Sequence, residues 1–429
     1  MVGIVRIWAL GLFSIAVIVA AVLLLRSWSE RLPDPRPTSA GPDTRIETTT
    51  YPDGRSVTSQ TPAEAALPPT FAERLSAWRP AIDLTTAYFV GGILLTLIVI
   101  GGGRGFWWLR LKLRPSGDDP QHQRGTEHRR IVRPDGSEIH IEFHGPADGP
   151  PIILTSGWGA TATEWYYLRR QLGDRFRLIA WDMPGLGLSK SAANKDCTLA
   201  KFADDLRAVL GEAGGRPALL LGHSIGGMIV LEFCKRFPED LNDRVAGLAL
   251  VHTSHTNPLR MTKTRWIAAP LQKPIIEPLA HLMIWLSPLV WVMNLFSYLN
   301  GSSHRGNHKQ LFDGTETWGQ LDFVTKYVPY VWPATYARGM LGMFHWDATA
   351  TLPRITVPTL VVAGAADRIT LPEASAIILN NCPSAKLVTL SPAGHMGLIE
   401  RHAEFGQELL AFAEECTGKI TTPPSAQVG

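Results

Sequence analysis

From about residue 129 to residue 416 the chain alternates short apolar runs with longer amphipathic stretches, and this alternation is its most constraining feature. Short apolar runs rich in β-branched residues are typical of strands buried on both faces, whereas the stretches between them have helical length and periodicity. The pattern predicts an α/β fold with a mainly parallel central sheet and helices on both faces. The expected strands are a hairpin over residues 129–143 and the runs 151–155, 176–182, 218–221, 245–251, 359–364 and 385–390, and the expected helices are 199–213, 226–237, 371–380 and 398–415.

The composition of the chain limits the class of protein to which it can belong. Hydrophobic residues make up 45% of the chain and charged residues 18%, which predicts a packed globular core rather than a disordered chain. The net charge is +3, and no long lysine and arginine block interleaved with aromatic residues occurs, so a nucleic-acid partner is not expected. The oligomeric state stays open.

Two uncharged apolar runs lie ahead of the alternating region, at residues 8–25 and 84–103. The first run nearly has the length needed to cross a hydrocarbon core of about 30 Å. The second run is followed at once by FWWLRLKLR, whose aromatic and basic side chains are typical of a membrane interface. We therefore expect transmembrane helices over residues 1–25 and 84–103. A cleaved signal peptide is the alternative for the first run, and a buried soluble helix is the alternative for the second.

The segments around these two runs complete the expected domain organisation. Residues 26–83 are rich in proline, threonine and serine and predict a poorly ordered loop outside the membrane, while residues 417–429 predict a disordered tail. Residues 104–127 form a basic juxtamembrane linker, whose arginines predict that the chain beyond it lies on the cytoplasmic side. The lipid bilayer is thus an expected partner.

The sequence LLLGHSIGG places Ser224 where the expected strand 218–221 ends and a helix begins. A residue at such a turn is held in a strained conformation and needs neighbours without bulk, which Gly222 and Gly226 provide. The carboxyl ends of parallel strands are also where open sheets bind ligands, and a helix N-terminus stabilises an anion there. Ser224 is therefore a candidate nucleophile.

A serine hydroxyl is a weak nucleophile by itself, so a base and an orienting acid must accompany it. Asp367 and His395 each follow one of the last two expected strands. The chain order of serine, acid and histidine brings both side chains to the sheet edge that holds Ser224. Asp347 is the alternative acid.

Four motifs, taken in their order along the chain, resemble the serine α/β-hydrolase superfamily over roughly residues 128–416. They are DMPGLG at 182–187, GHSIGG at 222–227, Ala366-Asp367-Arg368 and Gly394-His395. The resemblance implies that His395 accepts the proton of Ser224 and that Asp367 orients the imidazole and stabilises its charged form. This chemistry needs no metal and no organic cofactor.

An oxyanion hole needs two backbone N–H donors directed at the position where negative charge develops. One donor is expected from Ile225, next to the nucleophile, and the other from Trp158, in the turn after the strand 151–155. Many family members carry His-Gly where this chain has Ser156 and Gly157. The difference is expected to change the support of the loop rather than the backbone donor.

Three further residues near the motifs have simpler expected roles. Asp182 ends a strand before a Pro-Gly turn and is expected to stabilise that turn. His223 should point away from the direction of attack and contribute packing. His252 closes the strand 245–251 and either lines the pocket or is a structural histidine.

From about residue 255 to residue 347 the alternation of strands and helices stops, as expected for a helical cap inserted after the sixth strand. Residues 128–254 and 348–416 would then form the hydrolase core. The uncharged stretch 279–299 lies inside the cap and is long enough to cross a membrane, but a crossing there would separate Ser224 from its two partners. A broken lid helix that covers the cleft, dips into one leaflet, or does both is expected instead.

A serine at the elbow favours attack on an acyl carbonyl over the epoxide and halide chemistry of relatives that place a carboxylate there. The expected function is a membrane-anchored serine hydrolase that cleaves esters of lipophilic small molecules through an acyl-enzyme on Ser224. Three alternatives share the triad: a thioesterase or amidase, a carbon–carbon hydrolase, and an acyltransferase. A non-catalytic ligand-sensing module is the alternative from another class. The acyl chain and the alcohol of the substrate stay open.

Overall fold

The computed structural model of the chain describes residues 2–32, 44–50, 54–62, 69–77, 84–97, 102–112, 114 and 117–418. The chain divides into two compact units. The N-terminal unit comprises residues 13–100, and the sheet unit comprises residues 1–12 together with residues 101–429.

The sheet unit is built on one eight-stranded sheet of mixed direction. Its strand order is β10-β9-β8-β7-β5-β6-β4-β3, in which the six strands from β5 to β10 run parallel to one another. Strand β4 runs antiparallel to them, and the edge strand β3 pairs antiparallel with β4. The predicted α/β architecture is therefore confirmed. The strands are β3 (Glu127–Val132), β4 (Glu138–His144), β5 (Pro151–Thr155), β6 (Arg177–Trp181), β7 (Ala218–His223), β8 (Val245–Val251), β9 (Thr359–Gly364) and β10 (Ala385–Leu390).

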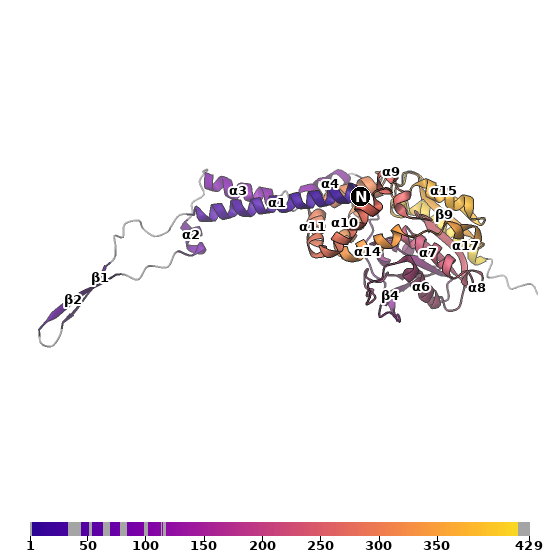
Figure 1. The fold of residues 1–429 in the computed structure, drawn as a ribbon, viewed down its shortest axis with the longest axis horizontal. Coiled ribbons are helices and arrows are strands. Elements are labelled where there is room, and N and C mark those ends of the chain that lie inside the picture. The colour runs from indigo at the N-terminus through magenta and orange to yellow at the C-terminus, as the bar shows by residue number, and fades with distance from the viewer. Residues whose placement is uncertain are drawn as a thin grey trace, which may run out of the picture. The chain divides into compact units, whose positions relative to one another are not determined.

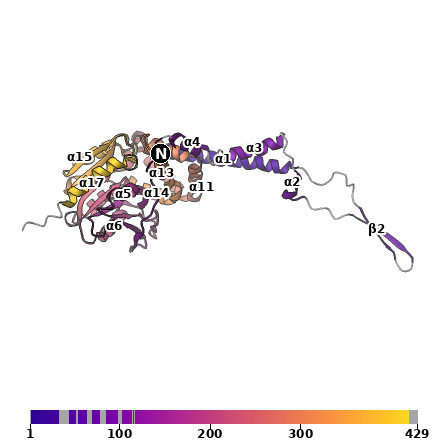
Figure 2. The same ribbon diagram turned by 180° about the vertical axis from the view of Figure 1, so that it is seen from behind.

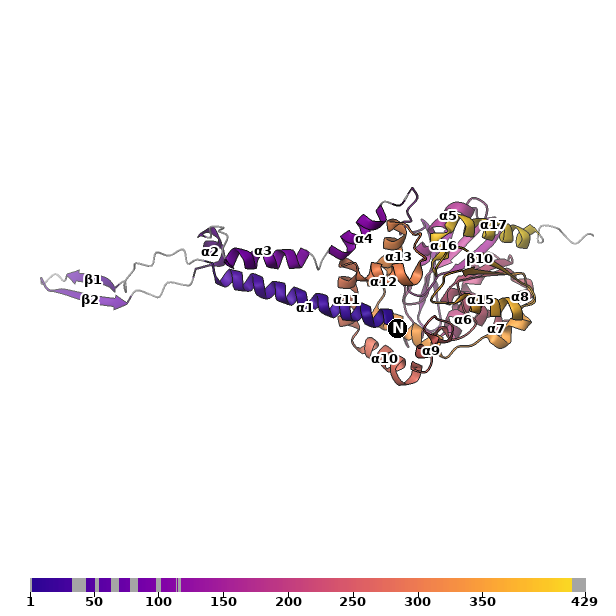
Figure 3. The same cartoon turned by 90° about the horizontal axis from the view of Figure 1, so that it is seen from above.

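Helices cover both faces of this sheet, because alternate residues of the buried strands point to opposite sides. Leu220 packs in one hydrophobic cluster with α6 and α7, whereas its neighbours Leu219 and Leu221 pack in a second cluster with α5 and α17. Figure 3 shows α5 and α17 on one side of β10 and α6, α7 and α15 on the other. These helices are α5 (Tyr166–Leu172), α6 (Leu199–Leu210), α7 (Ile225–Arg236), α15 (Pro372–Asn381) and α17 (His402–Gly418).

Six helices, called the inserted helices below, lie between β8 and β9 in the chain. The segment leaves and re-enters the core through a β-bridge between Thr256 and Asp347. The stretch expected to be a broken helix is α10 and α11, which meet at Leu286 with a bend of 94°. The inserted helices are α9 (Arg265–Ala268), α10 (Glu277–Trp285), α11 (Ser287–Leu299), α12 (Ser302–Leu311), α13 (Trp318–Tyr330) and α14 (Pro333–Phe344).

A helix can cross a membrane only if it is long and apolar enough, and the structure describes the helices of the ranges given above. Within that part of the chain, no single helix is both long enough and apolar enough to cross a membrane. The bent pair of 272–285 and 287–299 passes the same test only when its two helices are taken together.

The expected linker over residues 104–127 differs from a free tether. It contains α4 (Gly103–Lys112), which packs against the inserted helices through its buried side chains Trp107 and Leu111. The guanidinium of Arg104 donates to the carboxylate of Asp322 over 3.2 Å. Figure 1 and Figure 2 show α4 beside α11 and its neighbours. The segment therefore carries buried apolar side chains that pack against the inserted helices, which its basic residues did not indicate.

The N-terminal unit contains more regular structure than the poorly ordered loop expected over residues 26–83. The strands β1 (Thr44–Thr50) and β2 (Ser56–Pro62) pair antiparallel, which suits their many β-branched residues, and α2 (Phe71–Ala77) follows. Trp28, near the end of α1 (Val2–Glu30), lies with its ring centroid 4.5 Å from that of Phe89 in α3 (Leu84–Leu97). The end of the second apolar run, residues 98–101, and the expected tail beyond residue 418 lie outside the described residues.

Candidate functional site

Ser224 lies at the sharp turn between β7 and α7. Its backbone has φ +54° and ψ −119°, a conformation that non-glycine residues rarely adopt and that is typical of functional sites. A Cβ atom at Gly222 would overlap the backbone of Gly226, and one at Gly226 would overlap the carbonyl of Thr155. Both glycines are therefore required by the close approach of backbone to backbone, as the sequence predicted.

The structure brings the three predicted triad residues into contact. Nε2 of His395 lies 3.0 Å from Oγ of Ser224, and Nδ1 of the same ring lies 2.8 Å from Oδ2 of Asp367. Asp367 follows β9, and His395 follows β10, so neighbouring parallel strands deliver both side chains to the edge where Ser224 lies. This arrangement can move a proton from the serine hydroxyl to the imidazole.

Asp367 is buried and its carboxylate is held by several donors. Its Oδ1 accepts hydrogen bonds from the backbone N–H groups of Ile369 and Thr370, and its Oδ2 accepts one from the hydroxyl of Thr370. Burial alone would raise the pKa of Asp367, but the neighbouring His395 and the Thr370 N–H outweigh it and lower the pKa to about 2. The carboxylate is therefore ionised at neutral pH and fixes Nδ1 of His395 as a hydrogen-bond donor.

The alternative acid, Asp347, lies elsewhere. Its carboxylate accepts a hydrogen bond from the hydroxyl of Thr256 over 2.5 Å and another from the N–H of Thr349. These contacts place Asp347 at the base of the inserted helices. Asp367, not Asp347, is the carboxylate in contact with His395.

The two expected oxyanion donors are available. Within the described chain, the backbone N–H groups of Ile225 and Trp158 have no hydrogen-bond acceptor. The indole of Trp158 points toward the inserted helices, where its Nε1 donates to the carbonyl of Tyr336 over 3.0 Å. The loop that carries the second donor is thus attached to α14 through its own side chain.

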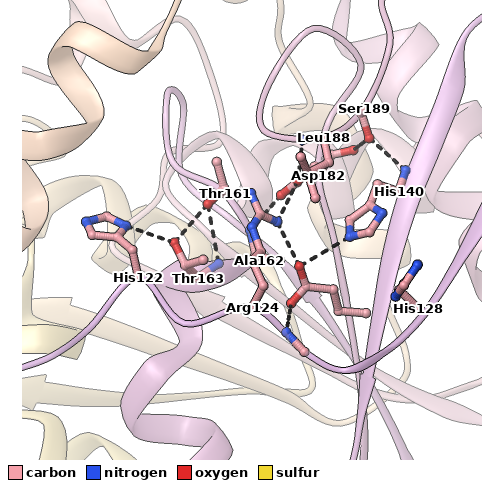
Figure 4. A network of polar contacts seen from close by, with 12 residues as sticks. His122, Arg124, His128, His140, Thr161, Ala162, Thr163, Asp182, Leu188 and Ser189 are labelled. Atoms are coloured by element: carbon pink, nitrogen blue, oxygen red, sulfur yellow. Dashed lines mark hydrogen bonds and ion pairs between the residues drawn. The ribbon is translucent and has the colours of Figure 1, made fainter.

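Asp182 stabilises its turn, as expected, and is part of a larger network (Figure 4). Its Oδ1 accepts from the N–H of Ala162 over 2.7 Å, and its Oδ2 accepts from Arg124 over 2.8 Å. Arg124 also donates to Glu142 over 2.8 Å. Burial opposes ionisation of Glu142, but its hydrogen bonds from His140 and its other neighbours hold the pKa of that carboxyl well below its usual range. The network ties the segment before β3 to the loop after β5.

His223 does more than pack. It is buried, with Nδ1 2.9 Å from Oε1 of Glu164 and Nε2 3.3 Å from the carbonyl oxygen of His395. Burial would lower the pKa of His223, but the carboxylate of Glu164 outweighs it and raises the pKa above its ordinary value. Sequence reasoning missed Glu164, because a single acid between Thr163 and Trp165 carries no motif.

His252 does not line a pocket, so that expectation is corrected. Its side chain is fully buried, with Nδ1 3.9 Å from Oδ2 of Asp367, and its backbone has φ +45°. Neither ring nitrogen has a hydrogen-bond partner in the described chain. Desolvation lowers the pKa of His252 to about 3, so the ring is neutral. The structural role, the second of the two expected for His252, is the one that the structure supports.

The inserted helices also contact the loop that carries His395. The buried carboxylate of Glu400 accepts hydrogen bonds from the N–H groups of Asp313 and Thr315, which follow α12, over 3.1 and 3.0 Å. Its other oxygen accepts from the N–H of Gly394 over 3.0 Å. The side chain of Glu400 therefore joins the inserted helices to Gly394, the residue that precedes His395.

A cavity of about 610 Å³ lies between the turn after β6 and the inserted helices. The turn contributes Ser191 and Lys195, and the inserted helices contribute Ile284, Pro288 and Arg338. The cavity is lined by apolar, hydroxyl-bearing and cationic side chains but not by the triad residues.

Comparisons with known proteins agree with this geometry. The sequence profile described as the alpha/beta hydrolase family matches residues 152–408. A curated relative from Stutzerimonas stutzeri (strain A1501), provisionally named carbamate hydrolase RutD, is 27% identical over 293 residues. The match covers 66% of this chain and 99% of that protein.

Solved structures share the architecture at low sequence identity. A thermophilic esterase from Thermogutta terrifontis has a TM-score of 0.52 and 24% identity, covering 68% of this chain and 99% of its own. A structure described as a membrane phospholipase A, a novel bacterial virulence factor, has a TM-score of 0.54 and 20% identity, covering 78% of this chain and 97% of its own. These likenesses show the fold alone.

Proposed function

Because the chain belongs to the α/β-hydrolase family, we propose that it is a serine esterase that cleaves carboxylic esters of lipophilic molecules through an acyl-enzyme on Ser224. The observation that carries the proposal is the hydrogen-bonded series from Ser224 through His395 to Asp367, with distances of 3.0 and 2.8 Å. The strained backbone of Ser224 supports it, because that turn presents the hydroxyl clear of the sheet.

In the first half of the proposed reaction, Oγ of Ser224 attacks the acyl carbon while Nε2 of His395 takes its proton. The negative charge that develops on the carbonyl oxygen is accepted by the N–H groups of Ile225 and Trp158. The C–O bond to the alcohol then breaks, and His395 returns the proton to the leaving oxygen. Asp367 stays ionised and stabilises the imidazolium throughout.

In the second half, a water molecule attacks the acyl-enzyme. Nε2 of His395 accepts a proton from that water, and the same two N–H groups hold the second oxyanion. Breakdown returns the proton to Oγ of Ser224 and releases the carboxylic acid. The atoms of one water molecule are thereby divided between the acid and the alcohol.

The lipophilic substrate class is supported by the surface of the inserted helices. Trp266 is 81% exposed and Trp285 is 78% exposed, and Ile267 is exposed beside Trp266. Arg265 lies over the Trp266 ring, 5.6 Å from its centroid, and Lys263 is exposed nearby. Exposed tryptophans flanked by cations suit the headgroup region of an anionic bilayer. We call Trp266, Ile267 and Trp285 the apolar surface of the insert.

We further propose that the two apolar runs anchor the chain in a membrane. Val22 and Leu23 of α1 and Leu94 and Leu97 of α3 leave their aliphatic side chains exposed, as lipid-facing residues would. The basic residues after the second run favour a cytoplasmic catalytic domain. A cysteine introduced at Thr126 should then resist an impermeant thiol reagent in intact cells, and labelling of it would refute this orientation.

A fluorophosphonate probe tests the proposed function directly. It should label the wild-type protein at Ser224, and Ser224→Ala should abolish labelling and lower ester turnover by about 10⁴-fold or more without changing the thermal unfolding transition. Unlabelled wild-type protein would favour the non-catalytic ligand-sensing alternative.

The choice between acyl substrates needs a separate panel. Esters of increasing chain length, a thioester, an amide and a carbamate should be compared at equal concentration, with an alcohol acceptor added to detect acyl transfer. We expect esters of long acyl chains to give the highest kcat/KM. A preference for a thioester, an amide or a carbamate would leave the proposed triad unchanged but would contradict the proposed substrate class.

A further inference from the structure

A second acid and histidine pair lies directly behind the triad. Glu164 belongs to the short 3-10 helix Ala162–Trp165 that follows the oxyanion loop, and it is only 2% exposed. Its Oε2 accepts a hydrogen bond from the backbone N–H of Gly157 over 2.9 Å, and its Oε1 lies 2.9 Å from Nδ1 of His223. Both carboxylate oxygens are therefore used inside the protein.

The partners of His223 define its protonation. Nδ1 faces the carboxylate of Glu164, and Nε2 faces the backbone carbonyl of His395 over 3.3 Å. A carboxylate and a carbonyl oxygen both accept hydrogen bonds, so these contacts favour the state in which both ring nitrogens donate, the imidazolium. The raised pKa of His223 agrees with this state, since the charge of Glu164 outweighs the effect of burial.

The pair therefore binds or adjoins the oxyanion loop, the serine elbow and the His395 loop. Gly157 directly precedes Trp158, whose N–H is a proposed oxyanion donor. His223 directly precedes Ser224, and its Nε2 holds the carbonyl of His395. A Cβ atom at Gly157 would lie 2.8 Å from Nδ1 of His223, so the oxyanion loop lies directly on the pair.

This arrangement also accounts for the unusual start of the loop. The loop begins with Ser156, whose hydroxyl donates to the carbonyl of Thr161 over 3.0 Å and closes the turn. The hydroxyl of Ser156 thus serves the loop itself, whereas the side chain of Glu164 binds both the loop and His223 at the elbow. This chain has Ser156-Gly157 where many family members have His-Gly, so the support of the loop was left open. That support comes from Glu164, seven positions after Gly157.

We propose that Glu164 is a positioning residue, whose buried carboxylate sets the relative placement of the oxyanion loop, the serine elbow and the His395 loop. The inference rests on the proposed serine-esterase function. Glu164 touches neither the substrate nor the reacting atoms. Its removal should weaken interactions made in the transition state far more than substrate binding, because the oxyanion donors would lose their fixed direction.

Two variants of similar shape separate positioning from general packing. Glu164→Gln keeps an acceptor for Gly157 and an amide that can donate to a neutral His223, whereas Glu164→Met keeps the volume and has no such groups. Glu232→Gln is the matched control, because Glu232 is also buried, at 5% exposure, and binds Trp346 away from the triad.

The measurements are kcat and KM for a short soluble ester, the inhibition constant of a trifluoromethyl ketone, and thermal unfolding. Glu164→Met should lower kcat and weaken the ketone by about 100-fold each, as for loss of one oxyanion donor, while KM changes less than about threefold. Glu164→Gln should recover at least about tenfold of that loss, and Glu232→Gln should match the wild type.

The possible failures are distinct. Wild-type protein without fluorophosphonate labelling would overturn the proposed function and this inference with it. A folded Glu164→Met variant with wild-type kcat and ketone affinity would overturn this inference alone, as would equal losses in the Gln and Met variants. If Glu164→Met does not unfold cooperatively, His223→Gln serves instead, and an unchanged kcat in that variant would overturn the inference.

Discussion

The carboxyl edge of the sheet and the inserted helices differ in how far their side chains are buried. Strands β5, β7 and β9 are buried at every position, and the polar groups at their ends have partners inside the protein. Helix α10, in contrast, has no buried residue, and Trp285 at its end is 78% exposed. The edge is thus stabilised by contacts within the chain, whereas α10 leaves apolar side chains exposed that a lipid bilayer or a ligand could cover.

The same difference extends to charge. At the sheet edge, Asp367 accepts four hydrogen bonds or close contacts, and Glu164 uses both of its oxygens. On the insert, Lys263 and Lys273 are exposed. A fixed edge suits chemistry that needs its reacting groups held within a fraction of an ångström. Exposed tryptophan and lysine side chains instead suit the proposed contact with lipid.

The largest effect should come from the edge. Asp367→Asn should lower kcat/KM by about 10³–10⁴-fold, because an amide no longer stabilises the imidazolium and can favour the wrong tautomer of His395. Asp347→Asn, at the base of the insert, should change kcat/KM less than about twofold. Steady-state kinetics on a soluble ester checks both, and a larger loss in the Asp347 variant would reverse the assignment of the acid.

The next effect concerns stability at the edge. His252 has its pKa lowered from 6.5 to about 3, so its folded form stays neutral where the unfolded chain takes up a proton. Its contribution to stability is complete above about pH 6.5 and is lost as the pH falls toward 3, by at most about 1.4 kcal/mol per pH unit.

His252→Asn removes that titration, and asparagine tolerates the left-handed backbone at this position. The free energy of unfolding, measured in denaturant between pH 7 and pH 4.5, should depend less steeply on pH in the variant. This range lies above the window from 3.8 to about 2 in which Asp367 titrates. Equal slopes in both proteins would mean that the ring is not held neutral.

The smallest effect should come from the insert. Trp266→Ser together with Trp285→Ser should lower hydrolysis of long-chain esters in anionic vesicles by about 10-fold, since two large apolar contacts with lipid are lost. Hydrolysis of a short soluble ester and the unfolding temperature should stay unchanged. Val132→Ser is the control, because Val132 is 73% exposed on β3 of the core. Equal losses with both esters would mean that the two tryptophans do not serve lipid contact.

Local patterns predicted the sheet well, because a buried strand is a run of consecutive apolar residues that can be recognised in the sequence. The bounds of β5, β8, β9 and β10 match the apolar runs at both ends. The elbow and its two partners could also be predicted, since their chemistry and order along the chain are distinctive. Their hydrogen-bonded geometry now agrees with that prediction.

The remaining features depend on pairs far apart in the sequence. Glu164 and His223 are 59 positions apart, and Arg104 and Asp322 are 218 apart. No periodicity marks such partners, so His223 was expected only to pack and residues 104–127 only to link. The two roles left open for His252 have a related cause: strand ends share an edge, but the direction of each side chain depends on the turn that follows.

Glu400 makes the insert hard to exchange as a module. Its carboxylate serves the N–H groups of Asp313 and Thr315 on one side and that of Gly394 on the other. The hydroxyl of Thr315 donates to the same carboxylate, so a foreign segment grafted between β8 and β9 would have to supply three donors at the same place. Without these donors one oxygen of the buried Glu400 carboxylate would be left unpaired, at a cost of about 1–3 kcal/mol. The same carboxylate binds Gly394, which directly precedes His395. Substrate range in this protein is thus better altered by changing side chains within the insert than by replacing it whole.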